Sequence, residues 1–259
     1  MIKKIIKYFI KKLGYEIVTS KKIFPITEAS EFERKLVKEA LNFSMTNEIR
    51  AWSLIQSIKY VKNNNISGDF VECGVYRGGN LLIYKKLSEK LNIDNSIFGF
   101  DTFDGMSEPV ELDKRIIDNR SAKMILSREP KRNSNETNFW CYANIDEVKK
   151  NLDIDDVDNK KINLIKGKVE DTLNIKKNLP NKISILRLDT DFYESTKKEL
   201  EILYPLLVNG GILIIDDYGY WDGARKAVDE YFENKKIWLH YIDHDCRLLI
   251  KHKDESKTN

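Results

Sequence analysis

The chain has 259 residues, 41% of them hydrophobic and 33% charged, which is enough for one large domain or two small ones. Its 44 Lys and Arg residues nearly balance its 41 Asp and Glu residues, and a net charge of +3 is no argument for nucleic acid, whose binding needs a clustered basic surface. The three cysteines, Cys73, Cys141 and Cys246, match neither a disulfide framework nor a zinc motif, a pattern typical of a reducing compartment such as the cytoplasm.

The first 18 residues, MIKKIIKYFIKKLGYEIV, have helical spacing of apolar residues with lysines on the other face. Lysines interrupt any apolar core of a signal peptide, and no stretch of the chain approaches the roughly 20 apolar residues that cross a bilayer. Two interpretations stay open for residues 1–18: a helix docked on its own domain or on a partner subunit, and a basic amphipathic helix lying on the inner face of an anionic membrane.

Further elements follow in chain order, beginning with two helices predicted over residues 27–41 and 46–61. From residue 69 onward, apolar runs alternate with amphipathic segments. The predicted strands are 69–75, 96–103, 161–167, 183–190 and 210–216; the predicted helices are 78–91, 144–152, 170–179, 195–207 and 222–232. Two more strands, 237–243 and 246–252, form a closing hairpin.

Strands that alternate with helices and carry continuous apolar runs indicate a parallel sheet covered on both faces. We therefore expect an α/β, doubly wound sheet of seven strands that ends in an antiparallel hairpin, with ligands at the carboxyl ends of its strands. N-terminal helices would occupy residues 1–66 and the sheet domain residues 67–259. The polar insert 104–140 is longer than connections usually are, which is typical of a functional lid.

The first strand leads into a glycine turn, VECGVYRGG at 71–79. The dinucleotide pattern G-x-G-x-x-G fails here, because Tyr76 stands where a glycine would admit a pyrophosphate. The pattern that matches, an acid followed by Gly74 and Gly78, suits a nucleoside ligand without phosphates such as S-adenosylmethionine, with Glu72 available for its ammonium group. A plain tight turn and an NAD site are the alternatives.

Acidic residues follow three of the predicted strands. Asp101 ends the second strand, where an acid commonly binds the ribose hydroxyls of a cofactor. Strands four and five, expected to be neighbours, end in LDTD (188–191) and IIDDY (214–218). Carboxylates gathered without His or Cys favour Mg²⁺, or else Mn²⁺ or Ca²⁺, although acids at such positions can also cap helices. Arg187, inside a buried strand, is expected to pair with one of these acids.

Five segments together resemble the macrocin O-methyltransferase (TylF-type) family, in that family's motif order and over residues 45–250. They are VECGVYRGG, FGFDTFDGM, FWCYANIDEVKKNL, LRLDTDFYESTKKELEILYPLLVNGG and DDYGYWDGARKAVDEYF. The resemblance implies a class I methyltransferase (Rossmann-like) fold, S-adenosylmethionine as cofactor, and Mg²⁺-dependent methylation of a sugar hydroxyl. It also implies a homodimer or a larger homo-oligomer.

By position, the resemblance also implies roles for individual residues. Asp189, Asp216 and Asp217 match the metal ligands, and the base is Asp189 or Asp191, with Asp191 favoured because the metal needs Asp189. The residues expected to contact the cofactor are Glu72, Cys73, Gly74, Gly78, Asp101, Thr102, Phe103, Gly105, Gly167, Val169, Glu170 and Asp189.

The resulting hypothesis is a sugar O-methyltransferase whose acceptor, with two neighbouring hydroxyls, is a nucleotide sugar, a surface polysaccharide or a glycosylated natural product. The metal would lower the pKa of the attacking hydroxyl, and a carboxylate would take its proton. Two other functions stay open: methylation of a catechol or another small diol, and a non-catalytic partner that keeps the fold. The lysine-rich N-terminus and the 104–140 insert depart from the antibiotic-tailoring members, so the particular sugar is not defined.

Overall fold

The computed structural model describes residues 10–14, 26–129, 139–154, 161–253 and 255, and its centre is a seven-stranded sheet. The strand order is β3-β2-β1-β4-β5-β7-β6, with β1 to β5 parallel and β7 antiparallel to both of its neighbours. The strands are β1 (Asp69–Cys73), β2 (Ile97–Asp101), β3 (Ile162–Lys166), β4 (Ile183–Leu188), β5 (Leu207–Ile215), β6 (His240–Tyr241) and β7 (Arg247–Ile250). The predicted doubly wound sheet with its closing hairpin is confirmed.

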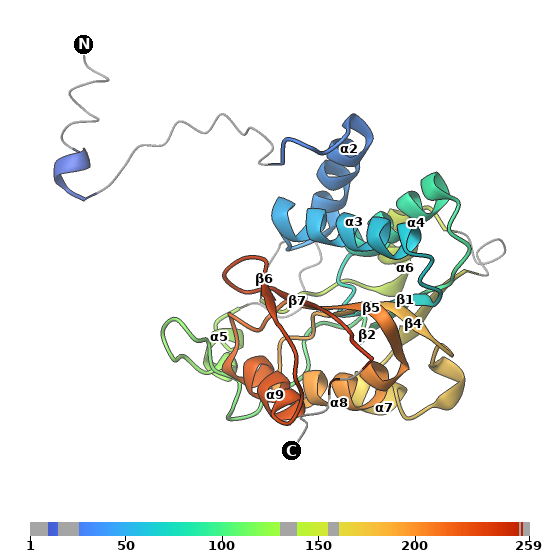
Figure 1. Cartoon of the computed structure of the whole chain (residues 1–259). Helices are drawn as coiled ribbons and strands as arrows, with labels where there is room; N and C mark the ends of the chain where they lie inside the picture. The colour runs from blue at the N-terminus through green and yellow to red at the C-terminus, as the bar shows by residue number, and fades with distance from the viewer. Residues whose placement is uncertain (1–9, 15–25, 130–138, 155–160, 254, 256–259) are drawn as a thin grey trace, which may run out of the picture.

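Helices cover both faces of this sheet, as Figure 1 shows. The face above it in that view carries α2 (Glu31–Ala40), α3 (Glu48–Asn63), α4 (Gly79–Leu91) and α6 (Ile145–Leu152). The opposite face carries α7 (Val169–Thr172), α8 (Tyr193–Leu203) and α9 (Asp222–Phe232). The remaining short elements are α5 (Ala122–Leu126), η1 (Leu41–Phe43), η2 (Lys176–Asn178) and η3 (Tyr204–Leu206).

The two-residue period of a strand divides its side chains between two hydrophobic cores. On β5, Ile212 and Ile214 pack with the residues of α2, α3 and α4, whereas Leu213 and Ile215 pack with those of α8 and α9. All four side chains are at most 3% exposed. Continuous apolar runs in the sequence therefore correspond to strands buried on both faces.

Side-chain caps begin the two N-terminal helices that the structure describes in full. Ser30 and Glu33 form a capping box at the start of α2. Asn47 begins α3 by accepting hydrogen bonds from the backbone N–H groups of Ile49 and Arg50. Both helices pack into the same core as α4, so they are continuous with the sheet domain.

Most predicted elements differ from the observed ones by a few residues at their ends, and two differ much more. The single helix expected over 170–179 is two short pieces, α7 and η2, because the side-chain amides of Asn174 and Asn178 donate to backbone carbonyls and compete with the helical ladder. The strand expected over 237–243 is reduced to His240 and Tyr241, both of them exposed at the edge of the sheet. Short strands are a common way to end a sheet.

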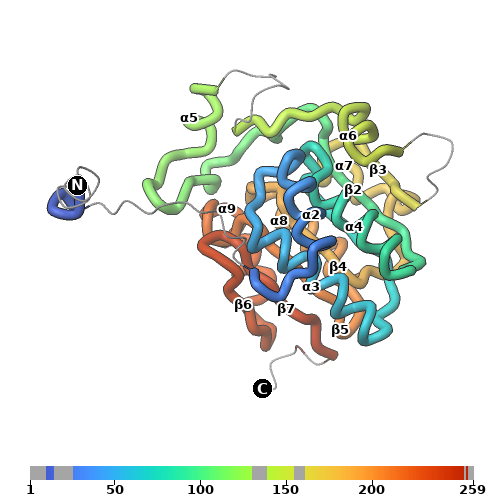
Figure 2. Tube along the Cα trace, turned by 90° about the horizontal axis from the view of Figure 1, so that it is seen from above, coloured from blue at the N-terminus to red at the C-terminus, as the bar shows by residue number. Residues whose placement is uncertain are grey.

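The insert 104–140 is held at its base by backbone contacts with the start of α9. Bridges pair Lys114 with Ser121 and Arg115 with Trp221, and the N–H of Ile116 donates to the carbonyl of Tyr220. Viewed from above in Figure 2, the insert extends beyond the helices that cover the sheet. Its one helix among the described residues, α5, lacked any assignment from the sequence.

The helix predicted over residues 1–18 lies largely outside the described residues, because residues 1–9 and 15–25 are not among them. Its contact with a membrane surface or with a second copy of the chain therefore stays a prediction. In the part of the chain that the structure describes, no helix is both long enough and apolar enough to span a membrane.

Candidate active site

The carboxyl ends of the parallel strands form one continuous edge. Backbone hydrogen bonds continue the ladder one residue beyond the strands: the N–H of Gly167 donates to Asp101, that of Asp189 to Cys73, and that of Asp216 to Leu188. These bonds fix the ends of β2 and β3, of β1 and β4, and of β4 and β5 relative to each other. This is the edge at which open α/β sheets bind ligands.

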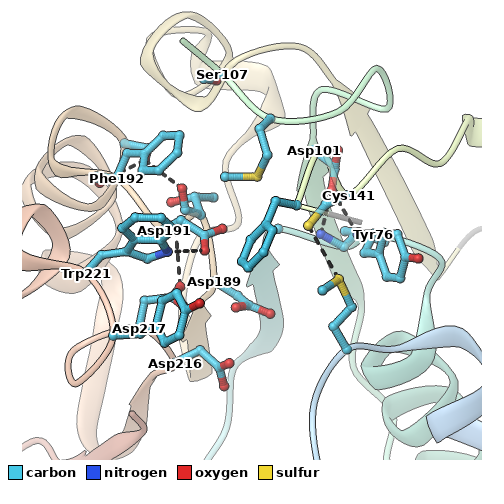
Figure 3. Close-up of a pocket in the computed structure, with 18 of the residues that line it drawn as sticks. Tyr76, Asp101, Ser107, Cys141, Asp189, Asp191, Phe192, Asp216, Asp217 and Trp221 are labelled. Carbon is cyan, nitrogen blue, oxygen red and sulfur yellow. Dashed lines mark hydrogen bonds between the residues drawn. The ribbon is translucent and has the colours of Figure 1, made fainter. Parts of the chain in front are cut away.

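A cavity of about 420 Å³ opens at this edge. Asp189, Asp191, Asp216 and Asp217 gather on one side of it, and Tyr76 and Asp101 lie on the other (Figure 3). Residues from the segment that precedes α3, from the insert and from the β6–β7 turn also line the cavity. It is large enough for a drug-sized ligand.

Gly74 allows the ends of β1 and β4 to approach each other closely. Its φ is +85°, and a Cβ atom there would lie 1.8 Å from the carbonyl oxygen of Asp189. Any side chain would therefore clash with the backbone as well as strain it. The glycine of the first turn is explained by this approach to the strand that carries Asp189.

Asp101 organises the turn after β1. Its Oδ2 accepts hydrogen bonds from the backbone N–H groups of Val75 (2.7 Å) and Tyr76 (2.9 Å), and its Oδ1 accepts from that of Phe103 (2.7 Å). Burial raises the pKa of this carboxyl, and the three N–H donors oppose that effect. The Thr102 hydroxyl lies 3.4 Å from Oδ1 but has a shorter hydrogen bond, 2.6 Å, to the carbonyl of Gly105, so a ribose hydroxyl could replace it at Oδ1.

Three carboxylates form a compact group on the opposite wall of the cavity. One oxygen each of Asp189, Asp216 and Asp217 lies within 4.8 Å of the others. Such a set of hard oxygen ligands suits Mg²⁺. The expected cluster at the ends of β4 and β5 is thus present, with the three side chains predicted for it.

Arg187 lies behind this group, inside β4. Its Nη1 donates to Glu72 Oε1 (2.8 Å) and to Asp189 Oδ2 (2.6 Å), and its Nη2 donates to Asp216 Oδ1 (2.6 Å). The parallel register of β1 and β4 places Glu72 beside Arg187, and Asn80 of α4 binds the same Glu72 oxygen. The predicted pairing of Arg187 with the acids is therefore confirmed.

Asp191 is held in an uncommon backbone conformation. Its φ is +67°, in the left-handed region that residues with a side chain seldom occupy. Its Oδ1 accepts from the indole Nε1 of Trp221 (2.7 Å), and its backbone N–H donates to Asp217 Oδ2 (3.2 Å). These contacts orient the carboxylate and leave Oδ2 available to the cavity.

The like charges of this wall oppose ionisation. Burial raises the pKa of Asp189 to about 6, against the effect of Arg187. Burial and then the charge of Asp189 raise the pKa of Asp191 to about 8. Burial and Asp191 raise the pKa of Asp217 well above its usual value. A cation at this wall would relieve the repulsion.

A mainly apolar surface lies next to the carboxylates. Ile125 and Leu126 of α5, together with Phe192 and Trp221, form a small hydrophobic cluster of their own. Asp113 connects the insert to the start of α8, because its carboxylate accepts a hydrogen bond from the N–H of Tyr193 (2.8 Å). The insert thus contributes one wall of the cavity.

The structure brings most of the predicted site residues into the cavity wall. They are Gly74, Asp101, Thr102, Gly105, Gly167, Val169, Asp189, Asp191, Asp216 and Asp217. The others expected to contact the cofactor are not lining residues: Glu72, Cys73, Gly78, Phe103 and Glu170. Glu72 is fully buried, and burial raises its pKa to about 8.

Several lining residues were not predicted from the sequence. The segment 44–47 and Arg50 come from the N-terminal helices, and Asp245 comes from the β6–β7 turn. The cap at Asn47 could have marked the start of α3, as Ser/Thr/Asn/Asp caps often do. Spacing along the chain carries no comparable signal for Arg50.

The sequence matches one family model and several individual proteins. The family model of macrocin-O-methyltransferase (TylF) matches residues 8–249. Demethyldecarbamoylnovobiocin O-methyltransferase of Streptomyces niveus is 32% identical over 184 residues, which cover 70% of this chain and 64% of that protein. The 8-demethyl-8-(2,3-dimethoxy-alpha-L-rhamnosyl)-tetracenomycin-C 4'-O-methyltransferase of Streptomyces olivaceus is 31% identical over 176 residues, with coverages of 67% and 61%. The matched region spans less than two thirds of either relative.

Among solved structures, that of the O-methyltransferase NovP has 27% sequence identity to this chain. The TM-score is 0.66, and the match covers 82% of this chain and 83% of NovP. The similarity confirms the methyltransferase fold predicted from the sequence.

Proposed function

Because the chain belongs to the macrocin O-methyltransferase (TylF) family, we propose that it transfers the methyl group of S-adenosylmethionine to a sugar hydroxyl with the help of Mg²⁺. One observation carries the proposal: a single cavity joins the turn around Gly74 and Asp101 to the carboxylates of Asp189, Asp216 and Asp217. A methyl donor bound on the first side would face a hydroxyl held on the second.

The cofactor would lie against the carboxyl ends of β1, β2 and β3. Asp101 would accept a hydrogen bond from a ribose hydroxyl through Oδ1. Gly167 and Val169, which line the cavity beyond β3, would lie along the adenine. Glu72 would act indirectly, since it lies behind the wall and binds Arg187.

Mg²⁺ would be held by Asp189, Asp216 and Asp217, where it would supply Lewis acidity that lowers the pKa of a bound sugar hydroxyl. Each of these carboxylates keeps a lone pair for a cation beyond its present hydrogen bonds. Two neighbouring hydroxyls of the acceptor suit such a site, because both can serve as oxygen ligands.

The transfer itself would be a single displacement. S-adenosylmethionine, held by the turn around Gly74 and Asp101, would supply the methyl group to the sugar oxygen, and its sulfur would keep the electron pair of the broken carbon–sulfur bond as a neutral thioether. Asp191 would accept the hydroxyl proton at Oδ2, the oxygen that Trp221 does not bind. Trp221 would keep the carboxylate aimed at the cavity during this step.

The acceptor would contact the apolar surface formed by Ile125, Leu126, Phe192 and Trp221. Such a wall suits the C–H face of a sugar ring and an apolar group attached to it. The relative from Streptomyces olivaceus is named for 4'-O-methylation of a rhamnosyl tetracenomycin, which favours a glycosylated natural product as the acceptor here. The described part of the insert would contact the acceptor through Ile125 and Leu126.

The test is a product screen with the purified full-length chain. S-adenosylmethionine would be incubated with free glycosides, glycosylated natural products, nucleotide sugars and catechols, and methylated products would be detected by mass spectrometry. We expect a methylated sugar that disappears with EDTA and returns with added Mg²⁺. Methylation that persists without divalent metal, or that occurs on catechols alone, would contradict the proposal.

A variant control separates the metal from the cofactor. Asp217→Asn removes one carboxylate of the metal group while leaving the turn around Gly74 and Asp101 intact. We expect loss of activity with S-adenosylmethionine binding retained in calorimetry. A variant that stays active would show that Asp217 is not a required ligand.

A further inference from the structure

Arg50, in the first turn of α3, binds carboxylates from two distant parts of the chain. Its Nη1 donates to Asp216 Oδ2 (2.7 Å), its Nε to Asp243 Oδ2 (2.7 Å) and its Nη2 to Asp245 Oδ2 (2.5 Å). The side chain is only 14% exposed and lines the cavity. Three different nitrogens of one planar group are thus committed to three different acids.

These contacts complete the fixation of Asp216. Its Oδ1 is held by Arg187 and its Oδ2 by Arg50, so a guanidinium binds each oxygen. The two arginines reach Asp216 from different elements, β4 and α3. Rotation of this carboxylate about its Cβ–Cγ bond would break at least one charge-assisted hydrogen bond.

Asp243, which accepts a hydrogen bond from Arg50 Nε, is itself held by several hydrogen bonds. Asp243 Oδ2 also accepts from the side chain of Asn47, the residue that caps α3, and Asp243 Oδ1 accepts from the N–H groups of Asp245 and Cys246. The β6–β7 turn and the start of α3 therefore form one hydrogen-bonded unit around Arg50. Within the described ranges, the one ion pair between that unit and the carboxylates of Asp189, Asp216 and Asp217 is the pair of Arg50 with Asp216.

We propose that Arg50 is a positioning residue for the divalent cation, which it serves by fixing the Asp216 carboxylate from the side of α3 and the β6–β7 turn. The inference rests on the proposed function, since it presumes a cation at Asp189, Asp216 and Asp217. It makes α3 and the hairpin, which lie outside the cofactor-binding strands, parts of the metal site.

The guanidinium shape distinguishes this role from a charge effect. A lysine at position 50 would keep the positive charge but could not serve three acids in one plane. An uncharged glutamine would leave the carboxylates more negative, which by electrostatics alone would tighten cation binding. Positioning predicts weaker binding in both variants.

The experiment is a titration of the full-length chain with Mn²⁺, in which electron paramagnetic resonance measures the free ion. This measurement does not depend on catalytic activity. For Arg50→Lys and Arg50→Gln we expect the dissociation constant for Mn²⁺ to rise about tenfold or more, as for other groups that orient metal ligands. The dissociation constant for S-adenosylmethionine should stay within about twofold of the unmodified chain, since no cofactor-side residue is changed.

Arg247→Lys is the matched control. Arg247 Nη1 donates to the backbone carbonyls of Asp243 and Cys246, so it supports the same turn without contacting Asp216. We expect this variant to bind Mn²⁺ like the unmodified chain. If Arg247→Lys weakens binding as much as Arg50→Lys does, general loosening of the turn explains the effect and the proposal is overturned.

The remaining outcomes are equally decisive. Unchanged or tighter Mn²⁺ binding in the Arg50 variants overturns the role of Arg50 but leaves the proposed function standing. If the unmodified chain binds no Mn²⁺, both the role of Arg50 and the metal site of the proposed function are overturned. Should both Arg50 variants fail to fold, Asp243→Asn carries the test, because it weakens one anchor of Arg50 outside the cavity. Weaker Mn²⁺ binding is expected there too, and unaltered binding refutes the inference.

Discussion

Asp191 and Asp189 are separated by one residue, yet the structure gives them different surroundings, and a pair of substitutions should separate their roles. Asp191→Asn keeps the shape of the side chain and an Oδ1 that can still accept from Trp221 Nε1 at 2.7 Å. The left-handed backbone at φ +67° suits asparagine at least as well as aspartate. The substitution therefore removes the basic oxygen with little other change.

The expected loss follows from the proton transfer assigned to Asp191. A positioned general base contributes about 10²–10⁴ in rate, so kcat for Asp191→Asn should fall by that factor, or about 3–5 kcal/mol in the activation free energy. Binding of Mn²⁺ and S-adenosylmethionine should persist. Asp189→Asn should instead weaken Mn²⁺ binding, because Asp189 belongs to the metal group and is paired with Arg187.

The assay is steady-state methylation with the best acceptor from the product screen, together with Mn²⁺ and cofactor titrations of each variant. If kcat of Asp191→Asn lies within about threefold of the unmodified chain, Asp191 is not the base. If Asp191→Asn loses Mn²⁺ as well, the residue acts through the metal instead. Trp221→Phe provides a control for orientation: the base is retained and its donor removed, so a smaller fall in kcat is expected.

Three further predictions concern other parts of the cavity. Gly74→Ala should fail to bind S-adenosylmethionine and should lower the unfolding temperature, because the new Cβ would lie 1.8 Å from the carbonyl oxygen of Asp189; near-normal cofactor affinity in calorimetry would refute this. Tyr220 lines the cavity beside Trp221, with 5.1 Å between the ring centroids. Tyr220→Ala should raise KM for the acceptor about 2- to 10-fold through lost ring contact while cofactor affinity stays constant; an unchanged KM would show that Tyr220 does not contact the acceptor. Burial raises the pKa of Asp243, but the hydrogen bonds from Arg50 and other donors outweigh burial and hold that pKa at about 2, below the usual 3.8. The ionised Asp243 therefore stabilises the fold fully above pH 4 to 5, and this stabilisation is lost as the pH falls towards 2. Asp243→Asn should therefore cost more unfolding free energy in urea at pH 7 than at pH 3, and an equal cost at both pH values would contradict the shift.

The carboxylate group could be predicted from sequence because its position depends on local rules. An apolar run predicts a strand buried on both faces, and the acids that follow such a run must lie at the carboxyl edge. β4 and β5 are sequential and adjacent, so Asp189 was expected near Asp216 and Asp217, as observed. The closing hairpin was equally visible as two apolar runs separated by a polar turn.

Glu72 shows where the same reasoning falls short. It lies within β1, not after it, so its side chain follows the alternation of the strand and faces the helices on the side of Phe70. A motif match placed it at the cofactor, whereas the sheet places it behind the wall, beside Arg187. Gly74 and Asp101, at the last positions of the edge, do reach the cavity.

Arg50 could not have been found by either route. It lies 166 residues from Asp216, and their contact depends on how α3 crosses the sheet and where the β6–β7 turn ends. Neither quantity follows from periodicity, which defines a helix and its buried face but not its placement along the sheet. Tertiary packing alone brings the guanidinium to the strand ends.

The charges on this side of the sheet alternate in sign from one element to the next. Glu72 pairs with Arg187, Arg187 with Asp189 and Asp216, Asp216 with Arg50, and Arg50 with Asp243 and Asp245. Asp216 thus lies between two guanidiniums, and these ion pairs and hydrogen bonds partly offset the cost of burying the charged side chains.

Asp217 stands outside this series. Among the residues that the structure describes, no guanidinium forms an ion pair with it, and its Oδ2 accepts the backbone N–H of Asp191. In the described part of the chain, Asp217 and Asp191, whose pKa values are raised by burial and by neighbouring acids, therefore lack an arginine partner and line the cavity. The arginines pair with Asp189 and Asp216, and the two acids without an arginine partner lie where a divalent cation and a sugar hydroxyl would meet.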